Sequence, residues 1–152
     1  MRAYVGLGSN LGEREETLRG AVARLGSDPR VEVVAVSSLR ETEPVGPITD
    51  QPRFLNGAVL LETTLAPREL LDLMLRIEAD FGRTRPGRPG GPRTLDLDLL
   101  LYGDEAVDEP SLQIPHPRLH ERNFVLEPLR ELGWVPSGRG YTERDESPRR
   151  AR

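Results

Sequence analysis

An Asp-Leu-Asp triplet inside an apolar run is the part of the sequence best suited to chemistry. The run Leu95-Asp96-Leu97-Asp98-Leu99 has the composition of a strand, in which successive side chains point to opposite faces. Both carboxylates therefore share one face, with their Cα atoms about 7 Å apart. Two such carboxylates repel each other unless a cation lies between them, and their hard oxygen atoms suit Mg²⁺ bound together with substrate phosphates. A strand with a solvated polar face is the alternative that the triplet alone leaves open.

Four arginines precede this strand in a segment rich in glycine and proline, residues 83–93. They are Arg83, Arg85, Arg88 and Arg93. A guanidinium group presents a rigid fork of donors to phosphate oxygens, and we expect a loop of this composition to be mobile enough to close over a bound triphosphate. An ordinary charged loop tip would also account for the arginines alone. Beside a carboxylate pair, they indicate phosphoryl chemistry.

Two other groups of residues suggest ligand contacts. Phe54 and Asn56 fall on one face of a predicted strand and offer a flat apolar surface beside a donor and acceptor, which suits a flat heterocycle, although Phe54 could equally belong to the core. His116 and His120 are the two histidines, but Pro117 disfavours the helical conformation at His116, so their spacing is not interpreted as a metal site. Phosphate contacts fit His116 and the nearby Arg122 better.

Composition limits the function classes. All 21 basic residues are arginine and the net charge is −4, which argues against a general nucleic-acid-binding surface. No run of about 18 apolar residues exists to span a membrane, and the start of the chain lacks the pattern of a signal peptide. There is no cysteine for disulfides or thiolate metal sites. We expect a cytoplasmic monomer with no nucleic-acid or membrane partner.

The elements that must position these residues follow from periodicity and from Gly and Pro punctuation. Strands are predicted at residues 2–8, 31–39, 54–62 and 95–102, and an irregular loop at residues 43–51. Helices are predicted around residues 18–25, from Pro67 to Gly82, and at residues 123–132. This order predicts an α+β, ferredoxin-like sandwich with helices packed on an antiparallel sheet. We expect one domain over residues 1–136 and a disordered polar tail at 137–152.

Four motifs, taken in order, resemble the 6-hydroxymethyl-7,8-dihydropterin pyrophosphokinase family. They are Gly6-Leu7-Gly8-Ser9-Asn10-Leu11-Gly12, Gln51-Pro52-Arg53-Phe54-Leu55-Asn56, Gly91-Pro92-Arg93-Thr94-Leu95-Asp96-Leu97-Asp98, and Ile114-Pro115-His116-Pro117 with Arg122-Asn123-Phe124. The third motif is long and specific, whereas each of the others is weak by itself. The match covers residues 4–132.

The resemblance implies a ferredoxin-like enzyme that transfers the β,γ-diphosphate of ATP to the pterin hydroxymethyl group and releases AMP, in folate biosynthesis. ATP and 6-hydroxymethyl-7,8-dihydropterin would be its partners, with two Mg²⁺ ions as cofactors. The residues that it assigns are Asp96 and Asp98 as metal ligands, Arg83 and Arg93 as catalytic groups on the transferring diphosphate, Glu78, Arg85, His116 and Arg122 at ATP, and Thr42, Val45, Phe54, Asn56 and Phe124 at the pterin.

Two other functions compete with this interpretation. Gly8-Ser9 followed by Asp96 and Asp98 is similar in outline to a magnesium-dependent nucleotidyltransferase, but nearly ninety residues separate the pairs, where those enzymes have a short helix. A non-catalytic ligand-binding module of the same fold is the second alternative. Release of AMP from ATP with a pterin acceptor would separate the first function from both.

Overall fold

The computed structural model describes all residues except 11, 43–52, 82–94, 118, 120–122 and 135–152, and the side chains of residues 123 and 124. The predicted irregular loop at 43–51, the arginine segment at 83–93 and the predicted tail at 137–152 therefore lie outside the described residues. Within the described part of the chain, no helix is both long and apolar enough to cross a membrane.

The predicted α+β architecture is confirmed. The sheet has the strand order β2-β4-β1-β5, β3 also pairs with β4, and all of these pairings are antiparallel. The elements in chain order are β1 (Arg2–Ser9), α1 (Arg14–Gly26), β2 (Val31–Val36), β3 (Arg40–Thr42), β4 (Phe54–Thr63), α2 (Pro67–Asp80), β5 (Asp96–Tyr102), β6 (Val107–Glu109), β7 (Leu112–Ile114) and α3 (Asn123–Glu131).

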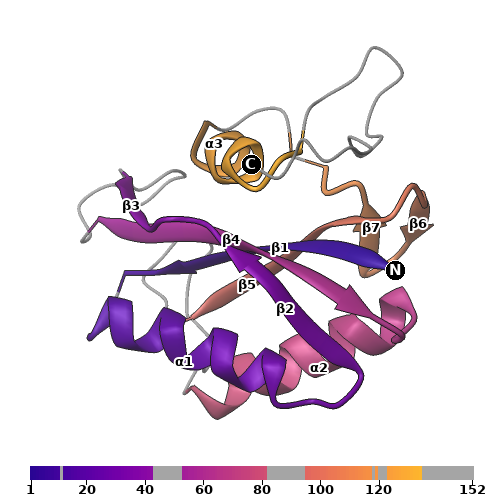
Figure 1. Ribbon diagram of the computed structural model, residues 1–152, viewed down its shortest axis with the longest axis horizontal. Coiled ribbons are helices and arrows are strands. Elements are labelled where there is room, and N and C mark those ends of the chain that lie inside the picture. Colours follow the sequence, from indigo (N-terminus) through magenta and orange to yellow (C-terminus); the bar gives the residue numbers. More distant parts are fainter. Residues whose placement is uncertain (11, 43–52, 82–94, 118, 120–122, 135–152) are drawn as a thin grey trace.

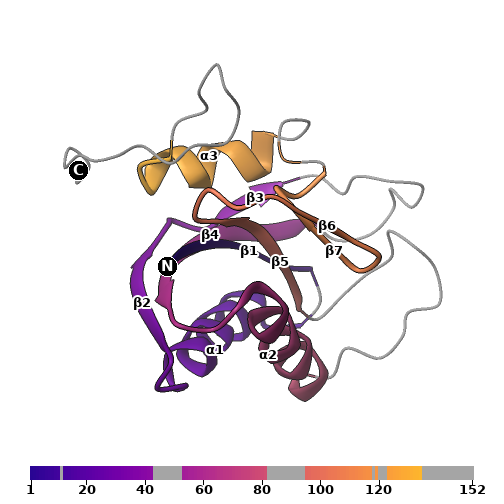
Figure 2. The ribbon, with the colours of Figure 1, turned by 90° about the vertical axis from the view of Figure 1, so that its right-hand side faces the viewer.

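The helices cover both faces of the sheet. Helices α1 and α2 lie side by side on one face, and α3 crosses the other (Figures 1 and 2). Each of the first two helices carries an apolar stripe, which in α2 includes Leu70, Met74 and Ile77 at helical spacing. Pro67 occupies the first turn of α2, and the Glu69 carboxylate accepts the backbone N–H of Ala66 at 2.9 Å, which satisfies one donor at the helix start.

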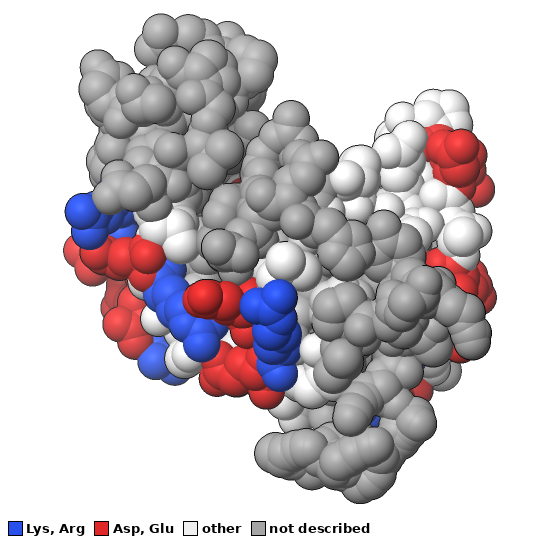
Figure 3. Space-filling model, turned by 90° about the horizontal axis from the view of Figure 1, so that it is seen from above, with Lys and Arg blue, Asp and Glu red and all other residues white. Residues whose placement is uncertain are grey.

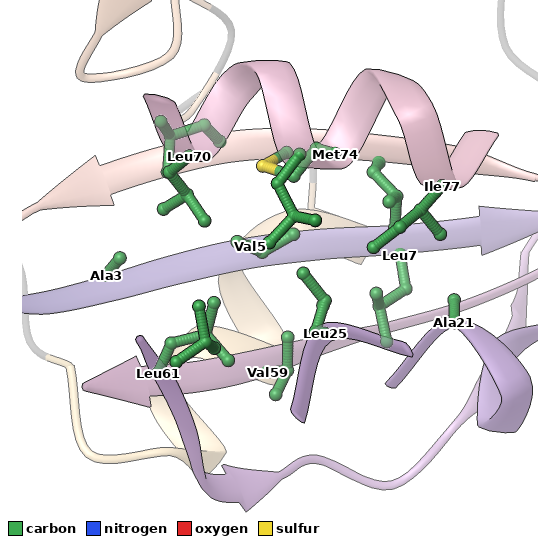
Figure 4. Close-up of a cluster of buried hydrophobic side chains, with 14 of the residues drawn as sticks. Ala3, Val5, Leu7, Ala21, Leu25, Val59, Leu61, Leu70, Met74 and Ile77 are labelled. Atoms are coloured by element: carbon green, nitrogen blue, oxygen red, sulfur yellow. The ribbon is translucent and has the colours of Figure 1, made fainter. Parts of the chain in front are cut away.

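The larger core lies between the sheet and the first two helices. Leu70, Met74 and Ile77 of α2 point toward Val5 and Leu7 of β1, while α1 and β4 close the other side (Figure 4). All five of these side chains are at most 3% exposed. Burial of apolar surface on this scale is the main favourable term in folding, at about 25 cal/mol per Å². It fixes which face of each strand points away from the helices.

A second, smaller core attaches α3 to the opposite face of the sheet. Leu126 and Leu129 of α3 and the fully buried Trp134 pack with Tyr4 and Leu60 of the sheet. The strand ends that carry the polar motif residues lie outside this hydrophobic cluster.

Two local predictions need correction. The strand predicted at residues 31–39 ends at Val36, because the chain then crosses over Gly57 and re-enters the sheet as β3. A Cβ at Gly57 would stand 2.7 Å from Leu39 Cδ2, so a larger residue there would force the Leu39 side chain to shift. The hairpin β6–β7 was not predicted, since three-residue strands carry almost no periodic signal.

Candidate active site

The strand register brings the motif residues onto one sheet face. Asp96 and Asp98 pair with Gly8 and Gly6 of β1, and Gly8 also pairs with Asn56 of β4. Leu97 and Leu99 belong to the core against α1 and α2, so both carboxylates lie on the opposite face, as predicted from alternation. Asn56, Gly6, Gly8, Asp96 and Asp98 are called the sheet-face site below.

Two glycines of β1, Gly6 and Gly8, lie at the centre of this site, between the amide and the carboxylates. Asn56 and Asp96 flank Gly8 from its two neighbouring strands, so about 10 Å separates their backbones, twice the inter-strand spacing. A Cβ at Gly8 would stand 2.8 Å from Asn56 Oδ1, closer than side-chain atoms approach without displacement. Glycine at position 8 therefore lets the Asn56 amide lie over the sheet. This role of Gly8 as a spacer was not predicted from the sequence.

The amide side of the site is held by β3. Asn56 is 8% exposed, and its Nδ2 donates a hydrogen bond to Thr42 Oγ1. Thr42 pairs with Phe54 in the register, so Thr42, Phe54 and Asn56 share this edge of the site. These are three of the five residues that the resemblance assigned to the pterin. The short Arg40–Thr42 strand that positions them was not predicted.

His116 reaches the carboxylate side from a distant segment. Its Nε2 lies 3.8 Å from Asp98 Oδ1, and its backbone N–H donates to the Leu100 carbonyl at 3.0 Å. The second contact ties the residue to β5, the strand that carries both carboxylates. The structure thus brings His116 and Asp98 together, although eighteen positions separate them in the chain.

Glu78 supports the carboxylate strand from the helix side. Its side chain is 4% exposed, and one carboxylate oxygen accepts the backbone N–H of Leu97 at 2.6 Å, between the two aspartates. A buried charge-assisted bond of this kind fixes a strand more firmly than a neutral one. A direct contact with ATP stays a prediction, whereas the burial favours a supporting role. The sequence signal was available, because Glu78 continues the buried i, i+4 stripe of Leu70 and Met74.

A bulge in β5 lets one strand serve the site and both cores. Val5 pairs with Leu99 and Tyr4 with Leu101, so Leu100 is an extra residue on β5. Leu99 therefore faces the core with α1 and α2, whereas Leu100 and Leu101 both belong to the core under α3. The carboxylates end up on the face that α3 leaves open. No pattern in the sequence predicted that the alternation of side chains between the two faces of β5 is interrupted at Leu100.

The remaining assigned residues are not placed by the structure. Val45, Arg83, Arg85, Arg93 and Arg122 lie outside the described residues, and so does the side chain of Phe124, although its backbone belongs to α3. Among the residues that are described, no group of three or more His, Cys, Asp or Glu side chains forms a metal site. Asp96 and Asp98 are half-exposed and lie beside Gly8 and Gly6, and their carboxylates offer oxygen ligands. Such a pair suits Mg²⁺ whose coordination shell is completed by water and phosphate oxygens.

The fold and the sheet-face site together define an α+β protein with paired carboxylates and an amide edge on one open sheet face. The profile of the 7,8-dihydro-6-hydroxymethylpterin-pyrophosphokinase family matches residues 4–133. The chain belongs to this family, which confirms the resemblance.

Curated relatives agree with the profile. The chain is 53% identical over 130 residues to the 2-amino-4-hydroxy-6-hydroxymethyldihydropteridine pyrophosphokinase of Bacillus subtilis, covering 86% of this chain and 77% of the relative. The protein of the same name from Pseudomonas aeruginosa is 47% identical over 145 residues, 93% of this chain and 88% of its own. A folate synthesis bifunctional protein of Arabidopsis thaliana is 48% identical over 128 residues, which are 84% of this chain and 26% of the relative.

Proposed function

We propose that this protein is an ATP-dependent pterin pyrophosphokinase of folate biosynthesis, which transfers the β,γ-diphosphate of ATP to the hydroxymethyl group of 6-hydroxymethyl-7,8-dihydropterin and releases AMP. Family membership supports the activity, and the names of the relatives supply the pterin. The observation that carries the assignment to particular residues is the register that sets Asp96 and Asp98 across two glycines from Asn56. Carboxylates for a metal and an amide for a heterocycle then lie on one face of the sheet.

The roles proposed for individual residues follow from where they lie. Asp96 and Asp98 would hold Mg²⁺, which supplies neutralisation of the ATP phosphates when bound. Asn56 would present its Oδ1 to a ring N–H, because its Nδ2 is occupied by Thr42. Phosphoryl transfer depends mainly on positioning and charge stabilisation, so no covalent nucleophile is required. Two Mg²⁺ ions are part of the proposal.

The roles of the other residues rest on family resemblance. We infer that Arg83 and Arg93 stabilise the transferring diphosphate, and that Arg85, His116 and Arg122 contact ATP phosphates. Phe54 and Phe124 would enclose the pterin ring, with Val45 at its edge. The position of His116 beside Asp98 supports a place near the metal-bound phosphates.

The test is to incubate the protein with ATP, Mg²⁺ and 6-hydroxymethyl-7,8-dihydropterin and to quantify AMP and the pterin diphosphate. Asp96→Ala and Asp98→Ala should each abolish the Mg²⁺-dependent turnover and leave the circular dichroism spectrum unchanged. Asp104→Ala is the matched control, since Asp104 is exposed in the turn that follows β5. Full activity in either aspartate variant would overturn the metal assignment, and transfer of AMP to an acceptor would indicate a nucleotidyltransferase.

A cytoplasmic, monomeric state is also part of the proposal. Light scattering coupled to size exclusion tests the monomer, for which a mass near 17.0 kDa is expected.

A further inference from the structure

The three-residue strand β3 carries Thr42 into the site but has little support from the sheet itself. Among the described strands it pairs with β4 alone, through Arg40 with Asn56, Glu41 with Leu55 and Thr42 with Phe54. Strand alternation places Arg40 and Thr42 on the face of the sheet-face site and Glu41 on the opposite face. A strand this short at the edge of a sheet needs other contacts to keep its position.

Helix α3 supplies such contacts on the site face. Glu131, at the end of α3, accepts the backbone N–H and the hydroxyl of Ser38, each at 2.9 Å, and a hydrogen bond from Arg40 Nη2 at 3.1 Å. Three donors thus converge on one carboxylate. Because these donors belong to the segment that enters β3, Glu131 fixes the start of the strand to the helix. Among the described residues, the buried Arg40 Nη1 has no hydrogen-bond partner, and the side-chain bond of this guanidinium is the one from Nη2 to Glu131.

Helix α1 supplies a second clamp on the other face. Arg14 Nη2 donates to Glu41 Oε2 at 2.6 Å, and Arg14 Nη1 donates to the Arg53 carbonyl at 2.9 Å. One guanidinium therefore joins the middle of β3 to the residue before β4. Arg53 Nη1 lies 3.8 Å from the other Glu41 oxygen and adds to the same cluster. Seen from the side of α3, described arginines lie against acidic side chains (Figure 3).

We propose that Glu131 and Glu41 are positioning residues for the pterin edge of the site: from opposite faces they hold β3, and β3 holds the Asn56 amide through Thr42. The inference rests on the proposed pterin role of Asn56. The Thr42 hydroxyl accepts a hydrogen bond from Asn56 Nδ2, which leaves Oδ1 over Gly8. When β3 shifts, this hydroxyl moves away and the amide is free to rotate, so the acceptor no longer faces the ligand in every molecule.

The expected kinetic effect is specific to one substrate. Loss of Glu131 or Glu41 would act on pterin binding indirectly, through the orientation of the Asn56 amide. Because both carboxylates are partly exposed to solvent, we expect a moderate effect. The KM for the pterin should rise about 3- to 10-fold in Glu131→Ala and in Glu41→Ala. The KM for ATP should stay within about twofold, because Asp96 and Asp98 lie on β5, on the other side of β1. Ser38→Ala, which removes only the hydroxyl bond, should give a smaller change in the same direction.

A second readout follows the amide directly. The side-chain NH₂ signals of Asn56, assigned by their loss in Asn56→Ala, should broaden or shift in the ligand-free Glu131→Ala and Glu41→Ala proteins. Glu109→Ala is the matched control, because Glu109 is also an exposed carboxylate paired with an arginine, Arg68 at 2.5 Å, but it lies on β6 away from this edge. It should change neither the Asn56 signals nor the pterin KM.

The possible outcomes separate the inference from the proposed function. Pterin and ATP KM values that rise together, or do not change, in both clamp variants would overturn the inference. Asn56→Ala should raise the pterin KM at least as much as either clamp variant. If it does so while the clamp variants do not, the positioning role alone is wrong. If Asn56→Ala has no effect, the assignment of Asn56 to the pterin is wrong, and the inference is overturned with it.

Discussion

Replacement of Glu78 tests whether a buried carboxylate holds the metal-binding strand in place. In Glu78→Ala the backbone N–H of Leu97 loses its hydrogen-bond partner. This bond is buried in the wild type, where Glu78 is 4% exposed. A hydrogen bond to a charged group contributes about 1.5–3 kcal/mol, and removal of the buried side chain also leaves a cavity, so we expect a loss of about 3 kcal/mol in the free energy of unfolding. Glu78→Gln keeps an acceptor oxygen and should lose about 1 kcal/mol.

The same variant should affect turnover more than substrate binding. Leu97 lies between Asp96 and Asp98, so a shift of its backbone changes the separation of the two carboxylates. A misplacement of about 1 Å costs roughly 100-fold in rate, and we therefore expect kcat to fall by about 10- to 100-fold in Glu78→Ala. Urea unfolding measures the stability, and AMP release at saturating substrates measures kcat. Asp72→Ala, an exposed carboxylate on the same helix, should change neither quantity.

One result would refute this reasoning. If Glu78→Ala unfolds at the urea concentration of the wild type and shows only a raised KM for ATP, then Glu78 contacts the nucleotide and does not support β5. A loss of stability together with a lower kcat and little change in the KM for ATP would establish the supporting role.

Two further predictions concern Gly8 and the loss of stability at low pH. Gly8→Ala should raise the pterin KM by about tenfold, because its Cβ would stand 2.8 Å from Asn56 Oδ1 and displace the amide. An unchanged pterin KM in a steady-state assay would show that a glycine is not needed at this position. The hydrogen bond and charge of Arg14 hold the pKa of Glu41 below its ordinary value of 4.5, so the folded protein binds fewer protons there than the unfolded chain. The contribution of this carboxylate is complete above about pH 5 and is lost as the pH falls below 4.5 and through the folded pKa. In Glu41→Gln the midpoint of urea unfolding should therefore depend less on pH below 4.5 than it does in the wild type. A midpoint that falls as steeply with pH as that of the wild type would contradict this account.

Local sequence patterns were sufficient for most of the fold and for the carboxylates. The apolar stripe of α2 and the alternation in β5 are short-range features that burial enforces, so they predicted which residues face the core. Asp96 and Asp98 were predicted on one shared face for the same reason, and the structure confirms that this face lies opposite Leu97 and Leu99. The extended motif that ends at Asp98 then indicated the family, because a long run of residue types is far more specific than any single pair.

The sequence by itself thus determined the longer helices and strands, most of the core-facing residues and the family of this protein. Only the tertiary structure decided which distant residues meet, since that depends on strand register and on a bulge, neither of which has a local signal. The pairing of Gly8 with both Asn56 and Asp96 sets the width of the site, and the bulge at Leu100 turns Leu101 toward the core under α3. The clamps of Glu131 and Glu41 on β3 likewise join residues far apart in the chain, and their geometry exists only once both faces of the sheet are covered.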